Sequence, residues 1–368
     1  MWIYHNPVAI TFGSGSFDNL AALVGARPYL LVTYPDAPFT ALADRLAQRL
    51  GPPAGAVRDV APNPDIADVA RQASQTAMLK VRPEVVIAIG GGSVIDSAKV
   101  LAASAKGFAT VEALLKGEEA PAGWQPLPLI AVPTTSGTGS EVTCWATVWD
   151  RKAATKRSLD HPALYPEAAV IDPDLMRSMP HDLTVSTGLD ALSHALESLW
   201  NHNANPVTAS HAISAARSIL DVLPALVDTP DDPDLRSRMA GASLSAGLAF
   251  SGTRTAIAHS ISYPVTLRHG VQHGIACSFT LPMILDSLAD ADGLTGQALR
   301  EIFGPDLRVG ARWLAAFLDK LGIGLSPADY GIDDAEWQSI LTEATAGPRG
   351  RNFIAQITTL QPVLPCAA

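Results

Sequence analysis

The sequence predicts an α/β domain with a Rossmann-like parallel sheet, followed by an all-α domain. Its 368 residues exceed the usual span of one hydrophobic core, so two domains are expected. In the first half, short apolar runs alternate with helical patterns. After Asp172-Pro173, Ala-, Leu- and Ser-rich helical stretches take over. The boundary is therefore expected near Met179-Pro180, giving domains of residues 1–179 and 180–368. Helices of the second domain are predicted over residues 190–199, 207–223 and 235–250.

The first domain is predicted to contain buried strands separated by amphipathic helices. Strands are expected over residues 29–33, 56–60, 84–89 and 127–132. Helices are expected over residues 39–50, between Pro64 and Lys80, and over 93–105. The run EVVIAI over residues 84–89 is the clearest strand, because strands buried on both faces are almost continuously apolar. Strands that alternate with helices predict βαβ units and a mostly parallel sheet covered on both faces.

The composition excludes several classes of protein. Hydrophobic residues make up 48% and charged residues 17%, which is unlike a disordered chain. A formal net charge of -10 disfavours nucleic acids and anionic membranes as partners. The three distant cysteines, Cys144, Cys277 and Cys366, exclude a cysteine-rich zinc site and indicate a reducing compartment. The N-terminal residues also lack the pattern of a signal peptide. We expect a cytoplasmic protein with small-molecule partners; its subunit number stays open, with a homodimer as one alternative.

A glycine run directly follows the predicted strand that ends at Ile89. Gly90-Gly91-Gly92-Ser93 lets the backbone turn sharply and approach a ligand closely. The helix that follows offers unpaired N–H groups and a partial positive charge, which suit a pyrophosphate. The alternative is a tight turn with Ser93 as helix N-cap. Likewise, Asp96 and Lys99 on this helix are either part of the motif or a solvated pair.

A second loop follows the predicted strand at 127–132. Residues 133–141 (PTTSGTGSE) place five hydroxyls and two glycines in nine positions. Open α/β sheets bind ligands at the carboxyl ends of their strands, so such a loop can bond phosphate, ribose or carboxamide groups. An ordinary Ser/Thr-rich connector is the alternative. Two such loops together favour a dinucleotide.

Four side chains of the second domain have the chemistry of a metal site. Asp190 and His194 are four positions apart in a helical stretch and project from one face. His259 lies in a later helical run, and His273 precedes Gly274. One carboxylate and three imidazoles suit Fe²⁺ or Zn²⁺, and ligand softness does not decide between them. The spacing alone leaves packed or surface histidines as an alternative.

These motifs resemble those of the iron-containing (group III) alcohol dehydrogenases over nearly the whole chain. The matching segments are GGGSVIDSAK at residues 90–99, residues 133–143, Asp172-Pro173, GLDALSHALE at residues 188–197, and the pair formed by His259 and His273-Gly274. The resemblance implies the iron-alcohol-dehydrogenase fold, which is similar to dehydroquinate synthase, with NAD(P)H and one divalent metal as cofactors. Fe²⁺ is implied, with Zn²⁺ as the alternative. The implied metal ligands are Asp190, His194, His259 and His273. The implied cofactor-binding residues are Gly91, Gly92, Ser93, Thr134, Thr135 and Thr138.

The chain departs from the family pattern at two places. Where many members have a second histidine one turn after the third ligand, this chain has Tyr263, so a proton path through Tyr263, water or the cofactor ribose is implied. Where many NAD-preferring members have an aspartate after the first strand, this chain has Tyr34, with Asp36 two residues later. A 2′-phosphate is then less strongly repelled, so NADPH or dual use is expected unless Asp36 substitutes.

A narrower resemblance, to hydroxyethylphosphonate dehydrogenases (phosphonoacetaldehyde reductases), rests on Thr253-Arg254-Thr255 and on residues 259–264. It implies a role in phosphonate metabolism, with Arg254 and Arg268 as candidates to hold a phosphonate in bidentate fashion. Surface or interdomain salt bridges are the alternative for both arginines. The implied reaction is reversible reduction of a small aldehyde to a primary alcohol, with phosphonoacetaldehyde to 2-hydroxyethylphosphonate as the specific case. A general short-chain alcohol dehydrogenase, a dehydroquinate-synthase-like lyase and a non-catalytic nucleotide-binding protein also stay open.

Overall fold

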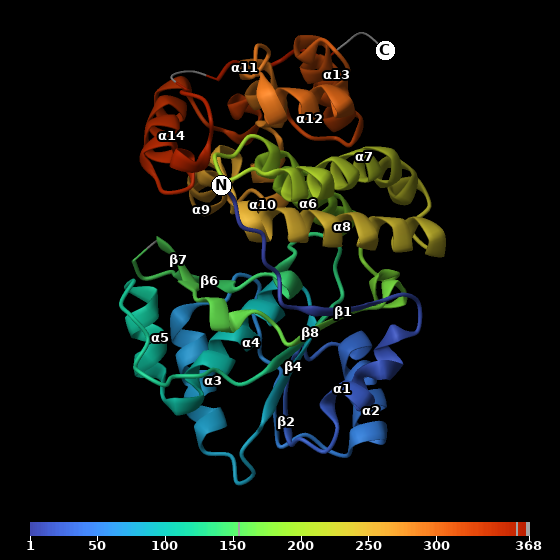
Figure 1. The fold of residues 1–368 in the computed structure, drawn as a ribbon, viewed down its shortest axis with the longest axis vertical. Helices are drawn as coiled ribbons and strands as arrows, with labels where there is room; N and C mark the ends of the chain where they lie inside the picture. The colour runs from blue at the N-terminus through green and yellow to red at the C-terminus, as the bar shows by residue number, and fades with distance from the viewer. Residues whose placement is uncertain (154, 358–359, 366–368) are drawn as a thin grey trace. The chain divides into compact units, whose positions relative to one another are not determined.

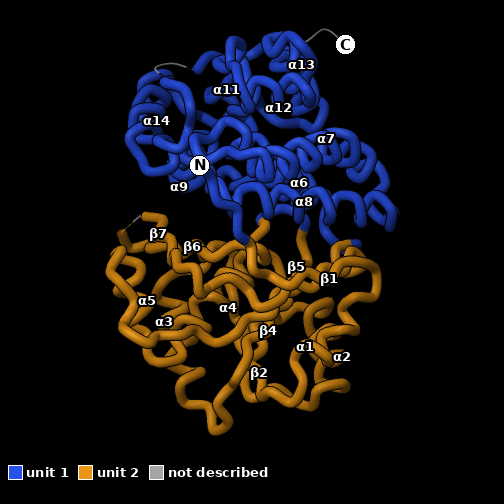
Figure 2. Tube along the Cα trace, viewed as in Figure 1, with its two compact units in different colours: residues 1–5, 136–138, 177–368 blue, residues 6–135, 139–176 orange. Residues whose placement is uncertain are grey.

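The computed structural model describes residues 1–153, 155–357 and 360–365. Cys366, one of the three cysteines, lies outside these described residues. The described chain forms two compact units: Asn6–Thr135 with Gly139–Met176, and Met1–His5 with Ser136–Thr138 and Arg177–Ala368 (Figure 2). We call them the sheet unit and the helical unit. That residues 1–179 and 180–368 fold as independent domains stays a prediction.

The sheet unit is built on six parallel strands in the order β1-β8-β5-β4-β2-β3. These strands are β1 (Ala9–Phe12), β2 (Tyr29–Thr33), β3 (Gly55–Val57), β4 (Val85–Gly90), β5 (Leu129–Pro133) and β8 (Ala168–Ile171). A separate antiparallel hairpin joins β6 (Trp145–Asp150) to β7 (Thr155–Asp160). The parallel sheet confirms the predicted Rossmann-like class.

Alternating side chains give the sheet two buried faces. Leu31 belongs to a core formed with α1 (Leu20–Val24) and α2 (Ala37–Leu50). Leu30 and Val32 belong to a second core on the opposite face. The helices of this second core are α3 (Ile66–Ala77), α4 (Gly92–Ala103) and α5 (Phe108–Leu115). Both faces are therefore covered, and every residue of β2, β4 and β5 is buried.

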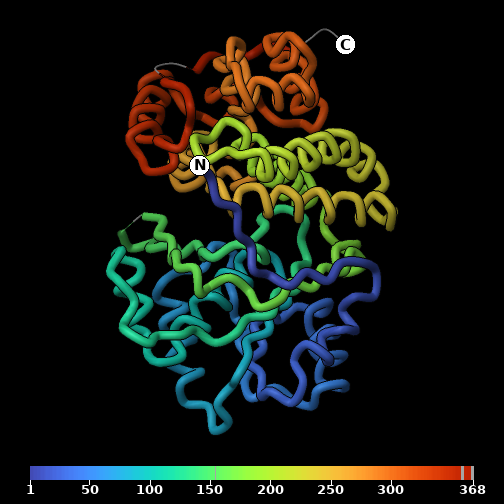
Figure 3. Tube along the Cα trace, viewed as in Figure 1, coloured from blue at the N-terminus to red at the C-terminus, as the bar shows by residue number. Residues whose placement is uncertain are grey.

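The helical unit packs its helices around one large apolar core (Figure 1). Its helices are α6 (His181–Leu199), α7 (Pro206–Asp228), α8 (Pro233–Thr253), α9 (Ile257–His269), α10 (His273–Ser278), α11 (Leu281–Ser287), α12 (Gly293–Phe303), α13 (Leu307–Lys320) and α14 (Asp334–Ala346). The first residues of the chain belong to this unit, where the Tyr4 ring lies 6.0 Å from that of His211; Figure 3 follows the chain from this end. Among the described residues, no helix is long and apolar enough to cross a membrane.

Candidate metal and nucleotide sites

The four predicted metal ligands lie together in the helical unit. Asp190 and His194 are on α6, His259 is on α9, and His273 is the first residue of α10. The carboxylate oxygen Oδ1 of Asp190 lies 3.8 Å from Nε2 of His194, 3.4 Å from Nε2 of His259 and 3.9 Å from Nε2 of His273. The first three side chains are buried, whereas that of His273 is 29% exposed. The cluster is therefore reached by solvent on the side of His273.

A glycine allows His273 to reach the cluster. A Cβ at Gly274 would lie 1.8 Å from the Ser186 carbonyl oxygen on α6, a distance that no side chain tolerates. Only glycine therefore lets the start of α10 pack directly on the backbone of α6. This contact places His273 at the end of α10 that faces Asp190.

The donor set fits a divalent cation. Among the buried side-chain atoms that the structure describes, Oδ1 of Asp190 and Nε2 of His259 have no hydrogen-bond partner. Two buried polar atoms that face each other at 3.4 Å without partners would be costly to bury. A cation bound by one carboxylate oxygen and three imidazole nitrogens would satisfy both atoms.

A buried carboxylate sets the tautomer of His259. Oε2 of Glu197 lies 2.6 Å from Nδ1 of His259, and Oε1 accepts the backbone N–H groups of Ala258 and His259 at 2.6 and 3.2 Å. Because a carboxylate only accepts, Nδ1 of His259 carries a proton in either charge state, and Nε2 is the nitrogen that can bind a cation. Glu197 is fully buried and lies two turns after Asp190 on α6.

His194 is oriented in a similar way. Its Nδ1 lies 3.3 Å from the carbonyl oxygen of Gly137, which can only accept, so its Nε2 also faces the cluster unprotonated. The Phe250 ring is stacked on it, with centroids 4.0 Å apart. Burial, with repulsion from His259, lowers the pKa of His194 to about 4 against the attraction of Asp190. The imidazole is therefore neutral at pH 7, as a metal ligand must be. For Asp190, burial favours the acid, but the neighbouring histidines outweigh it and lower its pKa.

Cys277 is a fifth potential ligand. Its sulfur lies 3.7 Å from Nε2 of His273, one turn earlier on α10, and groups geometrically with Asp190, His259 and His273. Burial raises the pKa of Cys277, which keeps it a thiol in the absence of a cation, whereas His194 offers a neutral lone pair. We therefore retain His194 as the fourth ligand.

Tyr263 lies next to the cluster, whereas Arg268, one of the two arginines predicted to bind substrate, pairs with glutamates. The Tyr263 ring is parallel to the His273 imidazole, with centroids 6.3 Å apart. Arg268 is exposed and pairs with Glu343 at 2.9 Å and with Glu336 at 3.7 Å. Arg254 is exposed at the end of α8 and adopts a left-handed φ of 67°. Arg268 therefore forms surface salt bridges, which is the alternative expected for it, whereas the role of Arg254 stays a prediction.

The glycine run of the sheet unit lies at a reversal of strand order. From β2 the chain passes outward to β3 and then returns to β4 on the other side of β2. Open α/β sheets bind ligands at such switch points. Gly91 is the N-cap of α4 and makes no side-chain cap bond, so Ser93 lies inside the helix and is not its cap. Tyr34 directly follows β2 and forms a hydrogen bond with Ser93. Burial raises the pKa of Tyr34, and this hydrogen bond partly offsets the rise. Asp36 is exposed nearby, at the N-cap of α2.

The second loop continues from β5, next to β4 in the sheet. The Thr134 N–H donates to the Gly90 carbonyl at 3.1 Å, and a Cβ at Gly91 would lie 3.2 Å from the Thr135 side chain. The two loops are therefore in contact within the sheet unit. Thr138 belongs to the helical unit, as does Gly137, whose carbonyl meets His194.

Asp96 and Lys99 are not a solvated pair. Lys99 is fully buried and donates to the carbonyls of Ser140 (2.7 Å) and Trp145 (2.8 Å). Asp96 accepts from the Ser140 hydroxyl at 2.6 Å and from the Thr147 N–H at 2.8 Å. Burial lowers the pKa of Lys99 to about 8. The pair holds the loop after β5 against α4.

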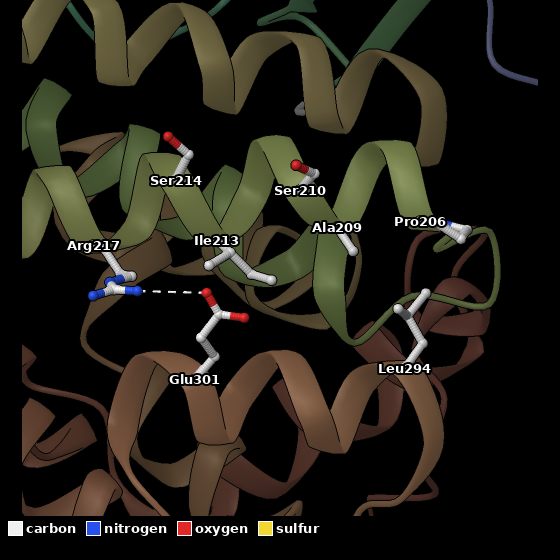
Figure 4. A pocket seen from close by; sticks show the side chains of 8 residues that line it. All are labelled: Pro206, Ala209, Ser210, Ile213, Ser214, Arg217, Leu294 and Glu301. Carbon is white, nitrogen blue, oxygen red and sulfur yellow. Dashed lines mark hydrogen bonds and ion pairs between the residues drawn. The ribbon is translucent and has the colours of Figure 1, made fainter.

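A separate surface pocket lies between α7 and α12 (Figure 4). Arg217 pairs with Glu301 across it at 3.4 Å. The residues that line it are Pro206, Ala209, Ser210, Ile213, Ser214, Arg217, Leu294 and Glu301. None of these is a member of the Asp190 cluster, so we assign the pocket no part in the chemistry.

Comparisons with known proteins identify the family of this chain. The family model described as "Iron-containing alcohol dehydrogenase" matches residues 7–173, and "Fe-containing alcohol dehydrogenase family, C-terminal" matches residues 184–358. The chain is 33% identical to a phosphonoacetaldehyde reductase of Streptomyces viridochromogenes over 83% of this chain and 81% of that protein. It is 32% identical to an NAD-dependent methanol dehydrogenase of Bacillus methanolicus over 76% of this chain and 74% of that one.

Among solved structures, the chain resembles a sulfoacetaldehyde reductase from Bifidobacterium kashiwanohense in complex with NAD⁺. The TM-score is 0.87 and the identity 31%, over 97% of this chain and 96% of the other. The predicted enzyme class, an alcohol dehydrogenase or aldehyde reductase with nicotinamide and metal cofactors, is confirmed at the level of the family. The chain belongs to the iron-containing alcohol dehydrogenase family.

Proposed function

We propose that this enzyme reduces a small aldehyde bearing a strongly acidic group, with phosphonoacetaldehyde as the specific case, to the primary alcohol. NADH or NADPH is the hydride donor, and the reaction is reversible. The observation that carries the reaction class is the Asp190 oxygen surrounded by three imidazole nitrogens at 3.4 to 3.9 Å.

The chain's own residues hold the two cofactors. Asp190, His194, His259 and His273 bind one divalent metal, for which the family favours Fe²⁺ and the donor set also suits Zn²⁺. The backbone of Gly91 and Gly92 and the side chain of Ser93 receive the pyrophosphate at the start of α4. Tyr34 and Asp36 lie on the adenosine side, and the hydroxyls of the second loop, on Thr134, Thr135 and Thr138, bond the rest of the dinucleotide. When bound, the metal supplies Lewis-acid polarisation of the aldehyde oxygen and the nicotinamide supplies the hydride.

We assign the proton path to Tyr263. Its half-buried ring lies beside His273 on the solvent side of the cluster. A phenol at this place can pass a proton from solvent toward the developing alkoxide. Arg268 forms ion pairs with two glutamates. Of the two arginines predicted to bind the acidic group, we therefore retain Arg254.

The names of two relatives support the substrate class. Phosphonoacetaldehyde and sulfoacetaldehyde are both acetaldehydes substituted with a tetrahedral oxyanion. The methanol dehydrogenase supports a second candidate, a short-chain alcohol dehydrogenase acting on neutral substrates. The lyase and the non-catalytic binder lose support, because both family models describe dehydrogenases.

The test measures how fast Fe²⁺- or Zn²⁺-loaded protein oxidises NADH and NADPH with different aldehydes as substrates. We expect kcat/KM for phosphonoacetaldehyde to exceed that for propanal by about tenfold or more, because charge-assisted hydrogen bonds to the acid group add transition-state binding. Both cofactors should serve, since Tyr34 takes the place of the usual aspartate. Turnover of neutral aldehydes alone would favour the second candidate, and no turnover with either metal would refute both.

The compartment and the subunit number belong with this proposal. A nicotinamide cofactor and the buried thiols of Cys144 and Cys277 suit the cytoplasm. A homodimer stays a prediction, which light scattering on the metal-loaded protein checks.

A further inference from the structure

We propose that Lys99 is a positioning residue for the nicotinamide cofactor: its buried ammonium fixes the end of the second loop, so that the loop is ordered before the nucleotide binds. This inference rests on the part of the proposed function that assigns the loop, residues 133–141, to the dinucleotide. It holds for any aldehyde that the enzyme reduces. Asp96, on the same helix, supports Lys99 in this role.

The start of the second loop lies beside the glycine run. The Thr134 N–H donates to the Gly90 carbonyl at 3.1 Å. A Cβ at Gly91 would lie 3.2 Å from the hydroxyl oxygen of Thr135, so this hydroxyl lies against the backbone at the start of α4. We assign the pyrophosphate to the same backbone, because a helix N-terminus offers unpaired N–H groups. The first residues of the loop are therefore placed to contact the nucleotide.

The end of the same loop is held by Lys99. At Gly139, whose φ of 59° is left-handed, the chain turns into the short helix η3 (Ser140–Val142). The Lys99 ammonium donates to the Ser140 carbonyl at 2.7 Å and to the Ser140 hydroxyl oxygen at 3.1 Å. Lys99 is fully buried, so water does not compete for these bonds.

The contacts of Lys99 continue into the next strand. Its ammonium donates to the Thr143 hydroxyl at 3.1 Å and to the carbonyl of Trp145, the first residue of β6, at 2.8 Å. Asp96, one turn earlier on α4, accepts from the Thr147 N–H of the same strand at 2.8 Å. The helix that begins at the glycine run therefore also carries the two side chains that hold the far end of the second loop.

Holding both ends matters because only five residues lie between Thr134 and Ser140. A short segment with fixed ends has few conformations to lose, so a ligand that binds it bears little of the ordering cost. If one end is released, the nucleotide must order the segment as it binds, and its affinity falls. Packing alone does not account for Lys99, since an apolar side chain of similar length would fill the same space without burying a charge.

The charge of Lys99 makes this anchor sensitive to pH. Burial lowers the pKa of Lys99 to about 8, against the attraction of Asp96, Cys144 and Glu141. Burial also raises the pKa of Glu141 to about 7, so this carboxyl ionises below pH 8 and then favours the ammonium. Lys156 is the other cation near Asp96. Above about pH 8, Lys99 loses one of its three donor hydrogens, so the anchor and the nucleotide affinity should weaken.

The experiment measures the NADH dissociation constant by fluorescence for zinc-loaded wild type, Lys99→Met, Thr143→Val and the control Lys106→Met. Methionine is similar to lysine in length but lacks the ammonium, and valine has the shape of threonine without the hydroxyl. At neutral pH we expect Lys99→Met to weaken NADH binding by about tenfold and Thr143→Val by about threefold. Lys106 is exposed beyond the end of α4, so Lys106→Met should match wild type.

Kinetics and pH separate positioning from a general loss of structure. In Lys99→Met the KM for NADH should rise in proportion to the dissociation constant, whereas kcat at saturating NADH should change by less than about threefold. With rising pH, the NADH dissociation constant of wild type and of Lys106→Met should increase through about pH 8. That of Lys99→Met should show no such increase. A pH profile of Lys99→Met that equals that of wild type would overturn the role of the charge.

Thr135→Val separates this inference from the proposed function, because it removes a loop hydroxyl and leaves Lys99 in place. If Thr135→Val weakens NADH binding while Lys99→Met and Thr143→Val bind NADH as wild type does, the loop assignment stands and the role of Lys99 is overturned. If only the Lys99 and Thr143 variants bind more weakly, the hydroxyl of Thr135 is wrongly assigned and the anchor stands. If none of the three differs from wild type, both fail. If Lys99→Met does not fold, the affinity of Thr143→Val decides.

Discussion

Asp190→Ala is expected to abolish stable metal binding and to lower kcat/KM for every aldehyde by about 10³-fold or more, since losing the Lewis acid removes several kcal/mol of transition-state stabilisation. Asp190 supplies the only carboxylate among the four assigned ligands, and its Oδ1 lies within 3.9 Å of all three imidazole nitrogens. Without it, a dication would be held by neutral ligands in a buried place. Metal content after dialysis, measured by mass spectrometry, and steady-state kinetics check this result.

The matched control is Cys277→Ser. Its sulfur also lies close to His273, but we place it outside the ligand set. The serine variant should retain wild-type metal content and most of the activity. If Cys277→Ser loses the metal while His194→Ala keeps it, the fourth ligand is the thiol, and the assignment of His194 is wrong.

Glu197→Gln is expected to weaken metal binding by about 100-fold, because partners that orient a ligating histidine account for roughly 10–100-fold in affinity. The glutamine amide can still accept from the backbone N–H groups of Ala258 and His259. Its NH₂ group would then face Nδ1 of His259 at 2.6 Å, where two donors cannot meet. The imidazole is thus driven to the other tautomer, with a proton on the nitrogen that must bind the metal.

The control for this variant is Ser193→Ala, also buried on α6. Its hydroxyl donates only to the helix, to the Leu189 carbonyl at 2.9 Å. It should leave the zinc dissociation constant unchanged. The unfolding temperature with and without zinc is a second readout: zinc should raise it in Ser193→Ala as in wild type and much less in Glu197→Gln. Equal zinc affinity in Glu197→Gln and wild type would show that the tautomer argument is wrong.

The apolar strands of the fold can be predicted from the sequence because burial on both faces leaves a continuous signal. The predicted bounds of β2 match those observed, and those of β4 and β5 are each displaced by one or two residues. Two other kinds of strand give no such signal. β1 is an edge strand that pairs only with β8 and is mostly exposed, and in β7 only Leu159 is buried. Their positions depend on contacts with distant segments, which a local pattern does not contain.

The candidate site divides in the same way. Asp190 and His194 share one helix, so their spacing is informative, and Glu197 on the same helix carries a similar local signal. Cys277, one turn after His273, is a second such signal. Arg268 is close in sequence to two ligands, but it points into a surface ion pair.

The four proposed ligands lie on α6, α9 and α10, so a bound metal would link helices that are far apart in the chain. A cation that binds only the folded chain stabilises it by about 2.7 kcal/mol when its free concentration is about 100 times the dissociation constant. The fraction of molecules open to proteases then rises as the metal is withdrawn. At a constant rate of synthesis, the amount of this enzyme in a cell should therefore follow the supply of its metal.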